Sequence, residues 1–505
     1  MSTTAKSVRE TERKYEADDS TELPDPTSLL GLGSSGDPED QHLEATYFDT
    51  ADLRLLRAKL TLRRREGGHD EGWHLKLPAG GDSRDEIRLP LGRARRQPPA
   101  ELAALTRVHT RGAALEPVAE LITQRRRWVL TDDAGREVVE VVDDQVTAHT
   151  MGEQTSSTSW REIEVELAEH GEPALLDEIE KRLRKIGIRR AQSSSKVGRV
   201  LADRLSGLPA AGADGVKRGS AADVVLAYLR EQVRVLRAQD PLVRRDAPDS
   251  VHQMRVAARR ARSALQAFRD VIPRDASRGL TDELRWLGNE LSEARDSEVI
   301  EERLHALVHE LPDDLVLGEV ANQITRSLER RRANGQKQAL AALDSDRYLA
   351  LQDSLDELLA HPPLTKKANR PAAKVLAKTI DRVWKQLRKR KRAVDAAAES
   401  HERDLALHET RKMAKRLRYA AEVAGPALGK RAAKVERKAK AVHKVLGDHQ
   451  DAVVARPEIR DLAAGMHTEG VNGFTFGLLY AAEDQRAAEA EGQFPSVWRK
   501  LAKAM

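Results

Sequence analysis

Residues 10–14 read Glu-Thr-Glu-Arg-Lys, at the start of the first extended segment of the chain. Side chains two residues apart in a β-strand project from the same face, so Glu10, Glu12 and Lys14 share one face. Two carboxylates and an ammonium group would be costly to bury in a dry core, whereas the wall of a wet cavity can hold them. The stretch therefore predicts a strand that lines a polar cavity.

Alternating segments of the same kind continue to about residue 205, separated by turn sequences such as Ala79-Gly80-Gly81-Asp82. Residues 162–167, Glu-Ile-Glu-Val-Glu-Leu, place three carboxylates on one face and three apolar side chains on the other, and Arg63 and Arg65 likewise share a face. Taken singly, each is the ordinary solvated face of an antiparallel sheet. Because separate strands carry charge of a single sign, we favour a closed barrel with a charged lumen. Its apolar outer face would pack against helices, which the spacing predicts over 99–107 and 173–186.

Such a lumen indicates a class of ligand. Arginine and lysine bind phosphate oxygens, and arginine often does so through two hydrogen bonds. Clustered carboxylates would repel phosphate unless a divalent cation lies between them, and Mg²⁺ is typically held by one or two carboxylates plus phosphate oxygens. Both kinds of charge together predict a metal–polyphosphate complex as the ligand.

The remainder of the chain has a different composition. Residues 206–220 are rich in Gly, Ala and Ser, which is typical of a linker. From residue 221 to 505, apolar residues recur at three- and four-residue spacing, which predicts almost entirely α-helical bundles. We therefore expect an α+β multidomain protein with a strand domain at 1–205, a linker at 206–220 and a helical domain at 221–505.

Composition excludes several classes of site. The 505 residues include no cysteine, which rules out disulfides, zinc–thiolate sites and a cysteine nucleophile. Aromatic residues make up only 3%, which disfavours base-stacking platforms for nucleic acid. We find no apolar leader and no apolar run of about 18 residues, so we expect a cytoplasmic protein without a membrane partner. Lys and Arg number 86 against 81 Asp and Glu, a near balance whose arrangement has to be explained.

The helical part contains two matching stretches, headed by His252 and His408, and the stretches around Asp296 and Asp451 match at nearly the same separation. These matches predict an internal duplication. Each first stretch places a histidine and three bases on one helix face, widened by further bases; the residues are His252, Arg255, Arg259, Arg260 and Arg262, and His408, Arg411, Lys412, Lys415, Arg416 and Arg418. One such stripe is usually a solvated helix face. Two with the same spacing favour an anion site, because like charges at i and i+4 destabilise a helix unless they are neutralised.

The strand part resembles the CYTH family of triphosphate tunnel metalloenzymes, on the motif at 10–14 and on segments 47–50, 62–65, 73–77 and 162–167, over roughly residues 5–203. The resemblance implies an eight-stranded antiparallel tunnel that hydrolyses or cyclises triphosphate compounds with Mg²⁺ or Mn²⁺. It implies metal binding by carboxylates, namely Glu10, Glu12, Glu86, Asp144, Glu164 and Glu166. It implies phosphate binding by bases, namely Lys14, Arg63, Arg65, Lys76, Arg84, Arg125, Arg127 and Lys196.

Within this resemblance Glu10, Glu12 and Lys14 are the catalytic residues, with Lys14 either gripping phosphate or orienting the attacking water. Three alternatives stay open at this point. They concern which two carboxylates of 162–166 hold metal, whether Asp143 or Asp144 assists them, and which arginines of 125–127 face the phosphates.

The helical part resembles the CHAD domain, a conserved histidine α-helical domain, over roughly residues 221–500 and on the two basic stripes. The resemblance implies two pseudo-symmetric helical bundles that bind inorganic polyphosphate along a basic surface, with Asp296 and Asp451 pairing with the stripes. The two histidines are either phosphate donors or structural residues. A polyphosphate partner would also place the protein at polyphosphate granules.

Four hypotheses follow. The leading one is metal-dependent hydrolysis of inorganic triphosphate in the tunnel, joined to polyphosphate binding by the helices. The second is a protein that only binds polyphosphate. The third is adenylate cyclase or thiamine triphosphatase activity in the same tunnel, since the same metal and phosphate residues would serve. The fourth, nucleic-acid binding by the basic helices, is disfavoured because aromatic residues and a DNA-reading motif are missing.

Overall fold

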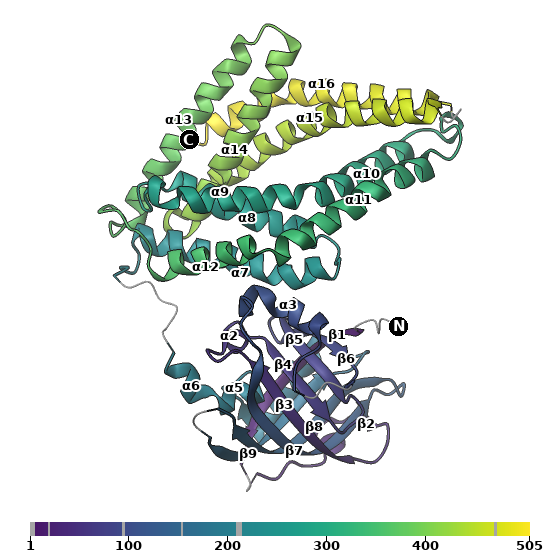
Figure 1. The fold of residues 1–505 in the computed structure, drawn as a ribbon, viewed down its shortest axis with the longest axis vertical. Helices are drawn as coiled ribbons and strands as arrows, with labels where there is room; N and C mark the ends of the chain where they lie inside the picture. The colour runs from purple at the N-terminus through teal and green to yellow at the C-terminus, as the bar shows by residue number, and fades with distance from the viewer. Residues whose placement is uncertain (1–5, 19–20, 93–95, 153–154, 209–214, 469–471) are drawn as a thin grey trace. The chain divides into compact units, whose positions relative to one another are not determined.

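The computed structural model of the chain describes residues 6–18, 21–92, 96–152, 155–208, 215–468 and 472–505. The chain separates into two compact units, Met1–Ala210 and Ala211–Met505. The strands lie in the first unit and the long helices in the second (Figure 1). The boundary between the units lies within the linker expected at 206–220, of which residues 209–214 lie outside the described residues.

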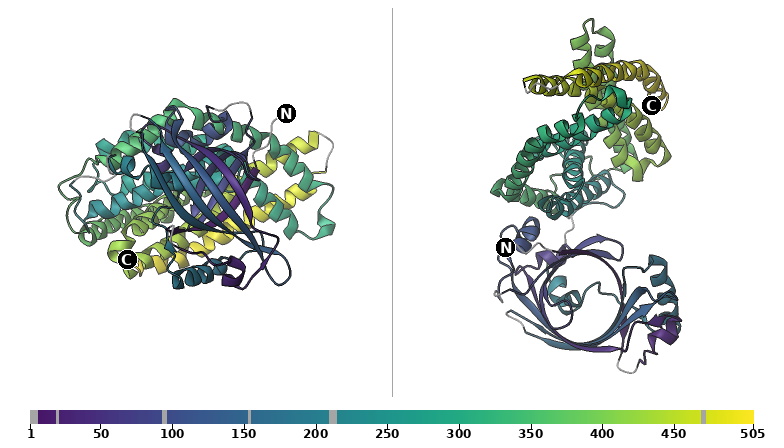
Figure 2. Two further views of the ribbon diagram at one scale, coloured as in Figure 1. Left: turned by 90° about the horizontal axis from the view of Figure 1, so that it is seen from below. Right: turned by 90° about the vertical axis from the view of Figure 1, so that its right-hand side faces the viewer.

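Eight strands of the first unit close into an antiparallel barrel, visible as a ring in the right-hand view of Figure 2. They are β1 (Lys6–Ala17), β3 (Glu39–Asp49), β4 (Thr61–Glu66), β5 (Gly72–Gly80), β6 (Ser83–Leu89), β7 (Glu116–Thr131), β8 (Glu137–Thr150) and β9 (Ser157–Leu167). Their order is β1-β6-β5-β4-β3-β7-β8-β9, and β9 pairs with β1 to close the ring. Two short strands extend the sheet, β2 (Gly33–Ser34) beside β7 and β10 (Arg189–Arg190) beside β1. The predicted eight-stranded antiparallel tunnel is confirmed.

The register of the strands puts the charged rows on one face of the barrel wall. Residues directly opposite each other in an antiparallel pair project from the same face. Glu12 lies opposite Glu166, and Lys14 opposite Glu164. Lys76 lies opposite Glu86 in the same way. This face lines the lumen, because the other face of the wall is covered by helices.

Apolar side chains on the outer face pack against those helices. Tyr15, Ile163 and Val165 belong to a buried cluster with side chains of α4 (Pro173–Lys185) and α1 (Pro26–Leu30). On the other side, Leu62, Trp73 and Ile87 form a second cluster with α2 (Arg54–Arg57) and α3 (Ala100–Thr110). The predicted outward packing of the faces opposite the acids is confirmed.

A short helix, α5 (Lys196–Val200), fills one end of the lumen. It begins at Ser195, whose hydroxyl accepts a hydrogen bond from the Gly198 amide at 3.1 Å. Its Val197 packs with Leu121 and Val146, which lie on the same faces of β7 and β8 as the lumen charges. Helix α6 (Ala202–Ser206) follows directly. The apolar end fixes α5 so that its first residue, Lys196, reaches the charged part of the lumen.

The second unit is almost entirely helical, as predicted. Its helices are α7 (Ala221–Arg244), α8 (Ser250–Ala267), α9 (Arg274–Glu290), α10 (Ser292–Glu310), α11 (Val320–Asp344), α12 (Asp346–Ala360), α13 (Ala372–Ala396), α14 (Ser400–Leu428), α15 (Lys430–Thr468) and α16 (Phe474–Ala502), with a short 3₁₀ turn at Asp313–Leu315. Contacts recur in the same order in both halves: α7 packs on α8 and α10 on α11, while α13 packs on α14 and α15 on α16. This recurrence agrees with an internal duplication. Among the described residues, no helix has a stretch apolar and long enough to cross a membrane.

Candidate active site

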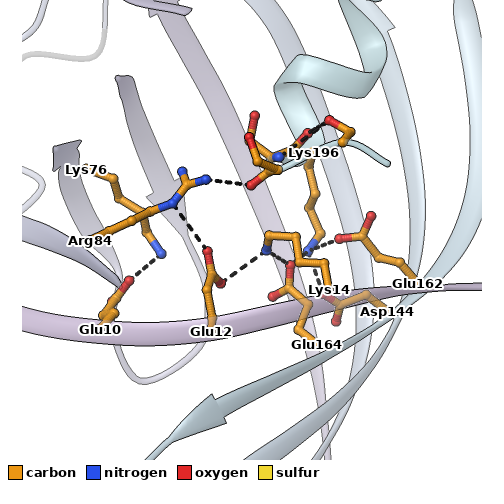
Figure 3. A network of polar contacts seen from close by, with 12 residues as sticks. Glu10, Glu12, Lys14, Lys76, Arg84, Asp144, Glu162, Glu164 and Lys196 are labelled. Atoms are coloured by element: carbon orange, nitrogen blue, oxygen red, sulfur yellow. Dashed lines mark hydrogen bonds and ion pairs between the residues drawn. The ribbon is translucent and has the colours of Figure 1, made fainter. Parts of the chain in front are cut away.

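The lumen face brings acids and bases from seven barrel strands and from α5 into one network, part of which is drawn in Figure 3. Glu10, Glu12 and Lys14 come from β1, Lys76 from β5, Glu86 and Arg84 from β6, and Asp144 from β8. Glu164 and Glu166 come from β9. All but Asp144 were predicted from the alternation of charge along the strands; Asp144 was an expectation of the family resemblance alone. The close-up shows the side chains of Glu10, Glu12 and Lys14 converging with Lys76, Arg84, Asp144 and Glu164 from different walls of the barrel.

One part of the network joins Glu10 and Glu86 through bases. Glu10 accepts from Lys76 Nζ at 2.5 Å and from Arg88 Nη2 at 2.7 Å. Arg88 also contacts Glu86, and Lys76 Nζ lies 3.6 Å from Glu86 Oε1. Burial would raise the pKa of Glu86, but Lys76 and the bonded His74 hold it below its usual value. Glu86 is therefore a charged carboxylate already satisfied by bases.

The second part, which we call the Asp144 group, consists of Asp144, Glu162 and Glu164. Their carboxylate oxygens lie within 4.8 Å of one another. Lys196 Nζ lies 2.9 Å from Asp144, 2.8 Å from Glu162 and 2.5 Å from Glu164. Arg125 forms two hydrogen bonds with Asp144, of 2.8 and 2.7 Å. Three buried acids thus converge on the position that one cation takes.

The Asp144 group bears on the three open alternatives. Asp144 faces the lumen, whereas Asp143 faces outward and pairs with Arg161 at 2.7 Å. Arg125 and Arg127 face the lumen side, whereas Arg126 projects outward beside Trp128. On the third alternative, Glu162 and Glu164 of β9 join the Asp144 group, whereas Glu166 lies outside it.

A third part, the Glu166 group, consists of Glu10, Glu12 and Glu166. Burial and the neighbouring carboxylate of Glu10 raise the pKa of Glu166 to about 8. Burial would also raise the pKa of Glu12, but the ammonium groups of Lys14 and Lys76 lower it to about 2. Lys14 lies 3.1 Å from Glu12 and also contacts Glu164, so it links this group to the Asp144 group. Glu166 makes no ion pair with any described residue.

Bases on the opposite wall carry charge without enough partners. Arg63 Nη1 donates to the Tyr47 hydroxyl at 3.4 Å, and Arg65 contacts Asp70. The Nε atoms of Arg63 and Arg65 are buried and have no hydrogen-bond partner among the described residues. Burial, with Arg63 and Arg125 nearby, lowers the pKa of Arg65 to about 9. Arg63 also lies 3.8 Å from Glu86, so the excess of positive charge that an anion site requires is found around Arg65.

Two further predicted bases lie at the edges of the network. Arg127 pairs with Glu140 at 2.7 Å. Arg84 donates to the Ser194 carbonyl at 2.6 Å and lies 3.9 Å from Glu12. A cavity of about 240 Å³ adjoins Arg84 and is lined also by Lys59, Thr61 and Ser195.

Sequence reasoning missed Arg88 and His74. Arg88 lies two residues beyond Glu86 and four beyond Arg84 on β6, so strict alternation along that strand would have placed it in the lumen. His74 precedes Lys76 by two residues and bonds Glu86 at 2.8 Å. Both orient the Glu10–Glu86 part of the network.

In the helical unit, the two basic stripes come together. Burial and then the guanidinium groups of Arg259 and Arg411 lower the pKa of Lys415 to about 6. Lys415 and Arg411 also help lower the pKa of His443 of α15, which sequence reasoning missed, to about 3, after burial. The Nε atoms of Arg411 and Arg418 and the Nε2 of His443 are buried without a hydrogen-bond partner among the described residues. We call Arg255, Arg259, Arg411, Lys415, Arg418 and His443 the basic cluster.

The other predicted members of the stripes lie around the basic cluster. Burial lowers the pKa of Arg262, and the neighbouring arginines, Arg416 among them, lower it further. Arg260 lies over the ring of Tyr419, and Arg295 lowers the pKa of His252 in addition to its burial. Of the second stripe, His408 bonds Gln450, and Lys412 is exposed and pairs with Glu409. The two predicted aspartates pair with the stripes: Asp296 lies 3.0 Å from Arg255, and Asp451 lies 3.8 Å from Arg411.

Comparison with known proteins finds a domain family for each unit of the chain. The family model of the CYTH domain matches residues 8–201, and that of the CHAD domain matches residues 227–460. An uncharacterized protein of Mycobacterium tuberculosis is 37% identical, over 98% of this chain and 97% of its own length. Among solved structures, PptA from Streptomyces chartreusis has 22% identity and a TM-score of 0.46, covering 55% of this chain and 99% of its own. The CHAD domain from the plant Ricinus communis has 23% identity and a TM-score of 0.42, covering 59% and 97%. The chain therefore belongs to the family of proteins that join a CYTH domain to a CHAD domain.

Proposed function

We propose that the barrel hydrolyses inorganic triphosphate with a divalent metal ion, and that the helical unit binds inorganic polyphosphate. One observation carries the first part. The three clustered carboxylates of the Asp144 group lie in the same lumen as Arg63 and Arg65, whose buried Nε atoms have no partner among the described residues. Acids alone would suit a metal and bases alone an anion; side by side they suit a metal–polyphosphate complex.

The Asp144 group and the Glu166 group would hold the metal. Both donor sets consist of carboxylate oxygens, the ligands that Mg²⁺ and Mn²⁺ prefer. A bound divalent ion would neutralise phosphate oxygens and stabilise the charge that develops during phosphoryl transfer. Lys196 and a divalent ion would compete for the Asp144 group. Glu86, already satisfied by Lys76 and Arg88, orients these bases in this proposal rather than holding metal.

The bases bind and position the substrate. Arg63, Arg65 and Lys76 bind the oxygens of the triphosphate. Arg84 contacts the end of the triphosphate at the edge of the adjoining cavity. Water attacks the terminal phosphorus in line with the bridging oxygen. A new phosphorus–oxygen bond forms, the bridging bond breaks, and a carboxylate of the Glu166 group accepts the proton of the water. The leaving diphosphate keeps the electron pair, which the arginines stabilise.

Phosphate release tests this proposal. The full chain would be assayed on triphosphate, longer polyphosphate, ATP and thiamine triphosphate, each with Mg²⁺ and with Mn²⁺. We expect triphosphate to be the best substrate, and Glu10→Gln to lower the rate at least about a hundredfold, since one charged group is lost from a site built on charge. Asp85→Asn is the matched control, because Asp85 lies on the outer face of β6 and pairs with the exposed Arg9.

The same panel decides among the alternatives. Full activity of Glu10→Gln would show that the site assignment is wrong. A chain without activity on any substrate would be a binding protein only. Preference for ATP with release of diphosphate would indicate a cyclase, and preference for thiamine triphosphate a thiamine triphosphatase.

The basic cluster carries the second part of the proposal. Buried cations without counterions destabilise a fold unless an anion neutralises them. Here Lys415 and the guanidinium groups of the basic cluster lie together on α8, α14 and α15. Asp296 and Asp451 pair with Arg255 and Arg411 and leave the other bases of the cluster to be neutralised. A linear polyanion matches such a surface, and inorganic polyphosphate offers one negative charge at each phosphate.

A further inference from the structure

A second cluster of metal-ligating side chains lies in the helical unit, apart from the basic cluster. It consists of Asp404 on α14, His449 on α15 and Glu491 on α16, whose ligand atoms all lie within 4.8 Å of one another. His449 is 2% exposed, so its imidazole is held between the three helices. The side chains of Asp404 and Glu491 are 23% and 29% exposed, so the cluster is open to solvent on one side.

The spacing of the ligand atoms fits a bound ion better than direct hydrogen bonds. His449 Nε2 lies 3.3 Å from Asp404 Oδ1 and 3.4 Å from Glu491 Oε1. Both distances exceed the usual range of N–H···O hydrogen bonds, which ends at about 3.2 Å. A tetrahedron with bonds of about 2.0–2.1 Å to nitrogen and oxygen ligands has edges of about 3.3–3.4 Å. The two contacts thus have the length of the edges of such a tetrahedron.

A supporting residue orients one ligand. Arg403 Nε donates to Glu491 Oε2 at 2.8 Å, which leaves Oε1 directed at His449. Outer hydrogen bonds of this kind fix the orientation of carboxylate ligands in metal sites. Asp404 lies one helical turn before His408 on α14, so the cluster adjoins the first residue of that basic stripe.

The other half of the duplication shows that the fold does not require these residues. The matched stretches pair Leu291 with Leu446, so Ala294 occupies the position of His449. There, α10 and α11 approach so closely that a Cβ on Gly335 would come within 2.4 Å of the Ala294 amide nitrogen. In the second half, the residue at the matching position is His449, which contacts Asp404 and Glu491.

We propose that Asp404, His449 and Glu491 form a binding site for a divalent transition-metal ion such as Zn²⁺. One imidazole nitrogen and two carboxylate oxygens supply three ligands, and water on the exposed side supplies the fourth. Imidazole in the ligand set favours zinc over magnesium, in contrast to the all-oxygen sets of the barrel. The ion ties α14, α15 and α16 together. This site is independent of the proposed hydrolysis.

Zinc counting on the full chain tests the site. Protein stripped with a chelator would be dialysed against Zn²⁺, and bound zinc measured per chain. We expect His449→Ala to bind about one zinc fewer than the wild type, because only two carboxylates would be left to hold the ion. His305→Ala is the matched control, since His305 lies 4.0 Å from Glu301 on one helix and has no third ligand of this kind in the described part of the chain.

Thermal unfolding, followed by helical circular dichroism, gives a second measurement. Zinc should raise the melting temperature of the wild type and of His305→Ala, but not of His449→Ala, because an ion stabilises only the folded state that binds it. Glu491→Gln keeps the shape of the site and should lose the zinc effect as well, so the test survives if His449→Ala folds poorly. Equal zinc content and equal zinc stabilisation in the wild type and Glu491→Gln would overturn the proposal.

Discussion

At the scale of single residues, Lys196 shows how the lumen holds several buried carboxylates close together: one ammonium group reduces the repulsion among them. Burial alone would lower the pKa of this lysine, yet Asp144, Glu162 and Glu164 hold it well above its usual value. The same ammonium group lowers the pKa of Asp144, which is fully buried. Removing one partner of a buried ion pair leaves an uncompensated charge, which usually costs more than the pair contributes.

Lys196→Met should therefore destabilise the barrel by about 3–5 kcal/mol in the presence of a chelator, the usual cost of breaking a buried pair. Mn²⁺ should recover much of this loss, because a divalent ion takes the position that Lys196 Nζ occupies among the three carboxylates. Thermal melts with chelator and with Mn²⁺ measure both effects. Arg9→Met is the control: its pair with Asp85 is 63% exposed on the arginine side and should be worth less than about 1 kcal/mol. A variant that melts like the wild type and gains no more from Mn²⁺ would contradict the assigned role.

Sequence alternation could predict most of the lumen residues, because the two-residue period of a strand fixes which side chains share a face. It placed Glu10, Glu12 and Lys14 together without knowledge of any partner strand. It could not predict the contacts of Lys196, because they depend on α5 folding into the end of the barrel through Val197. The inclusion of Glu162 in the Asp144 group likewise depends on the register between β8 and β9, where it lies opposite Asp144.

At the scale of elements, helical periodicity predicted the helices of the second unit but not which of them make the closest contacts. The buried residues of α7 follow the expected spacing, as Val225, Leu229 and Val233 do. A glycine within a helix is normally a weak point, since it lowers helix stability. Packing against the neighbouring helix explains Gly335 of α11: a Cβ at Gly335 would collide with the backbone of Ala294.

Gly335→Ala should destabilise the helical unit by about 1–3 kcal/mol, the usual cost of forcing an extra methyl group into a packed contact. Gly279→Ala on α9 is the matched control, because nothing lies within 4 Å of a Cβ added there. The control should stabilise the unit by up to about 1 kcal/mol through helix propensity alone. Denaturant unfolding of the two variants, followed by circular dichroism, measures the difference. Stabilisation by both substitutions would show that α10 and α11 can separate freely at this point.

At the scale of the whole molecule, the net charge of +5 is the sum of two different arrangements. In the barrel, acids and bases alternate across one lumen and largely neutralise each other. In the helical unit, bases from both halves of the duplication meet in the basic cluster, and the local surplus is large enough to lower the pKa of a lysine to about 6. An anion that binds there supplies the missing negative charge.

Polyphosphate binding should therefore be linked to proton uptake by Lys415. In the free protein this lysine loses its proton above about pH 6, and a bound polyanion raises its pKa again by neutralising Arg259 and Arg411. Affinity should be independent of this group below pH 6. It should fall as pH rises above 6, by up to about tenfold per pH unit where one proton is taken up. Titrations at pH 6, 7 and 8, at constant ionic strength and with a chelator to prevent hydrolysis, measure this dependence.

Lys415→Met separates this linkage from the titration of polyphosphate itself, which is common to all variants. The variant should bind with a weaker dependence on pH above 6, because the group that takes up the proton has been removed. Lys444→Met, at an exposed position on α15 next to His443, should keep the slope of the wild type. Since phosphate contacts of every kind weaken with salt, the comparison holds only at one ionic strength. An unchanged slope in Lys415→Met would place the polyanion away from the basic cluster, and displacement of bound polyphosphate by DNA would favour the nucleic-acid alternative.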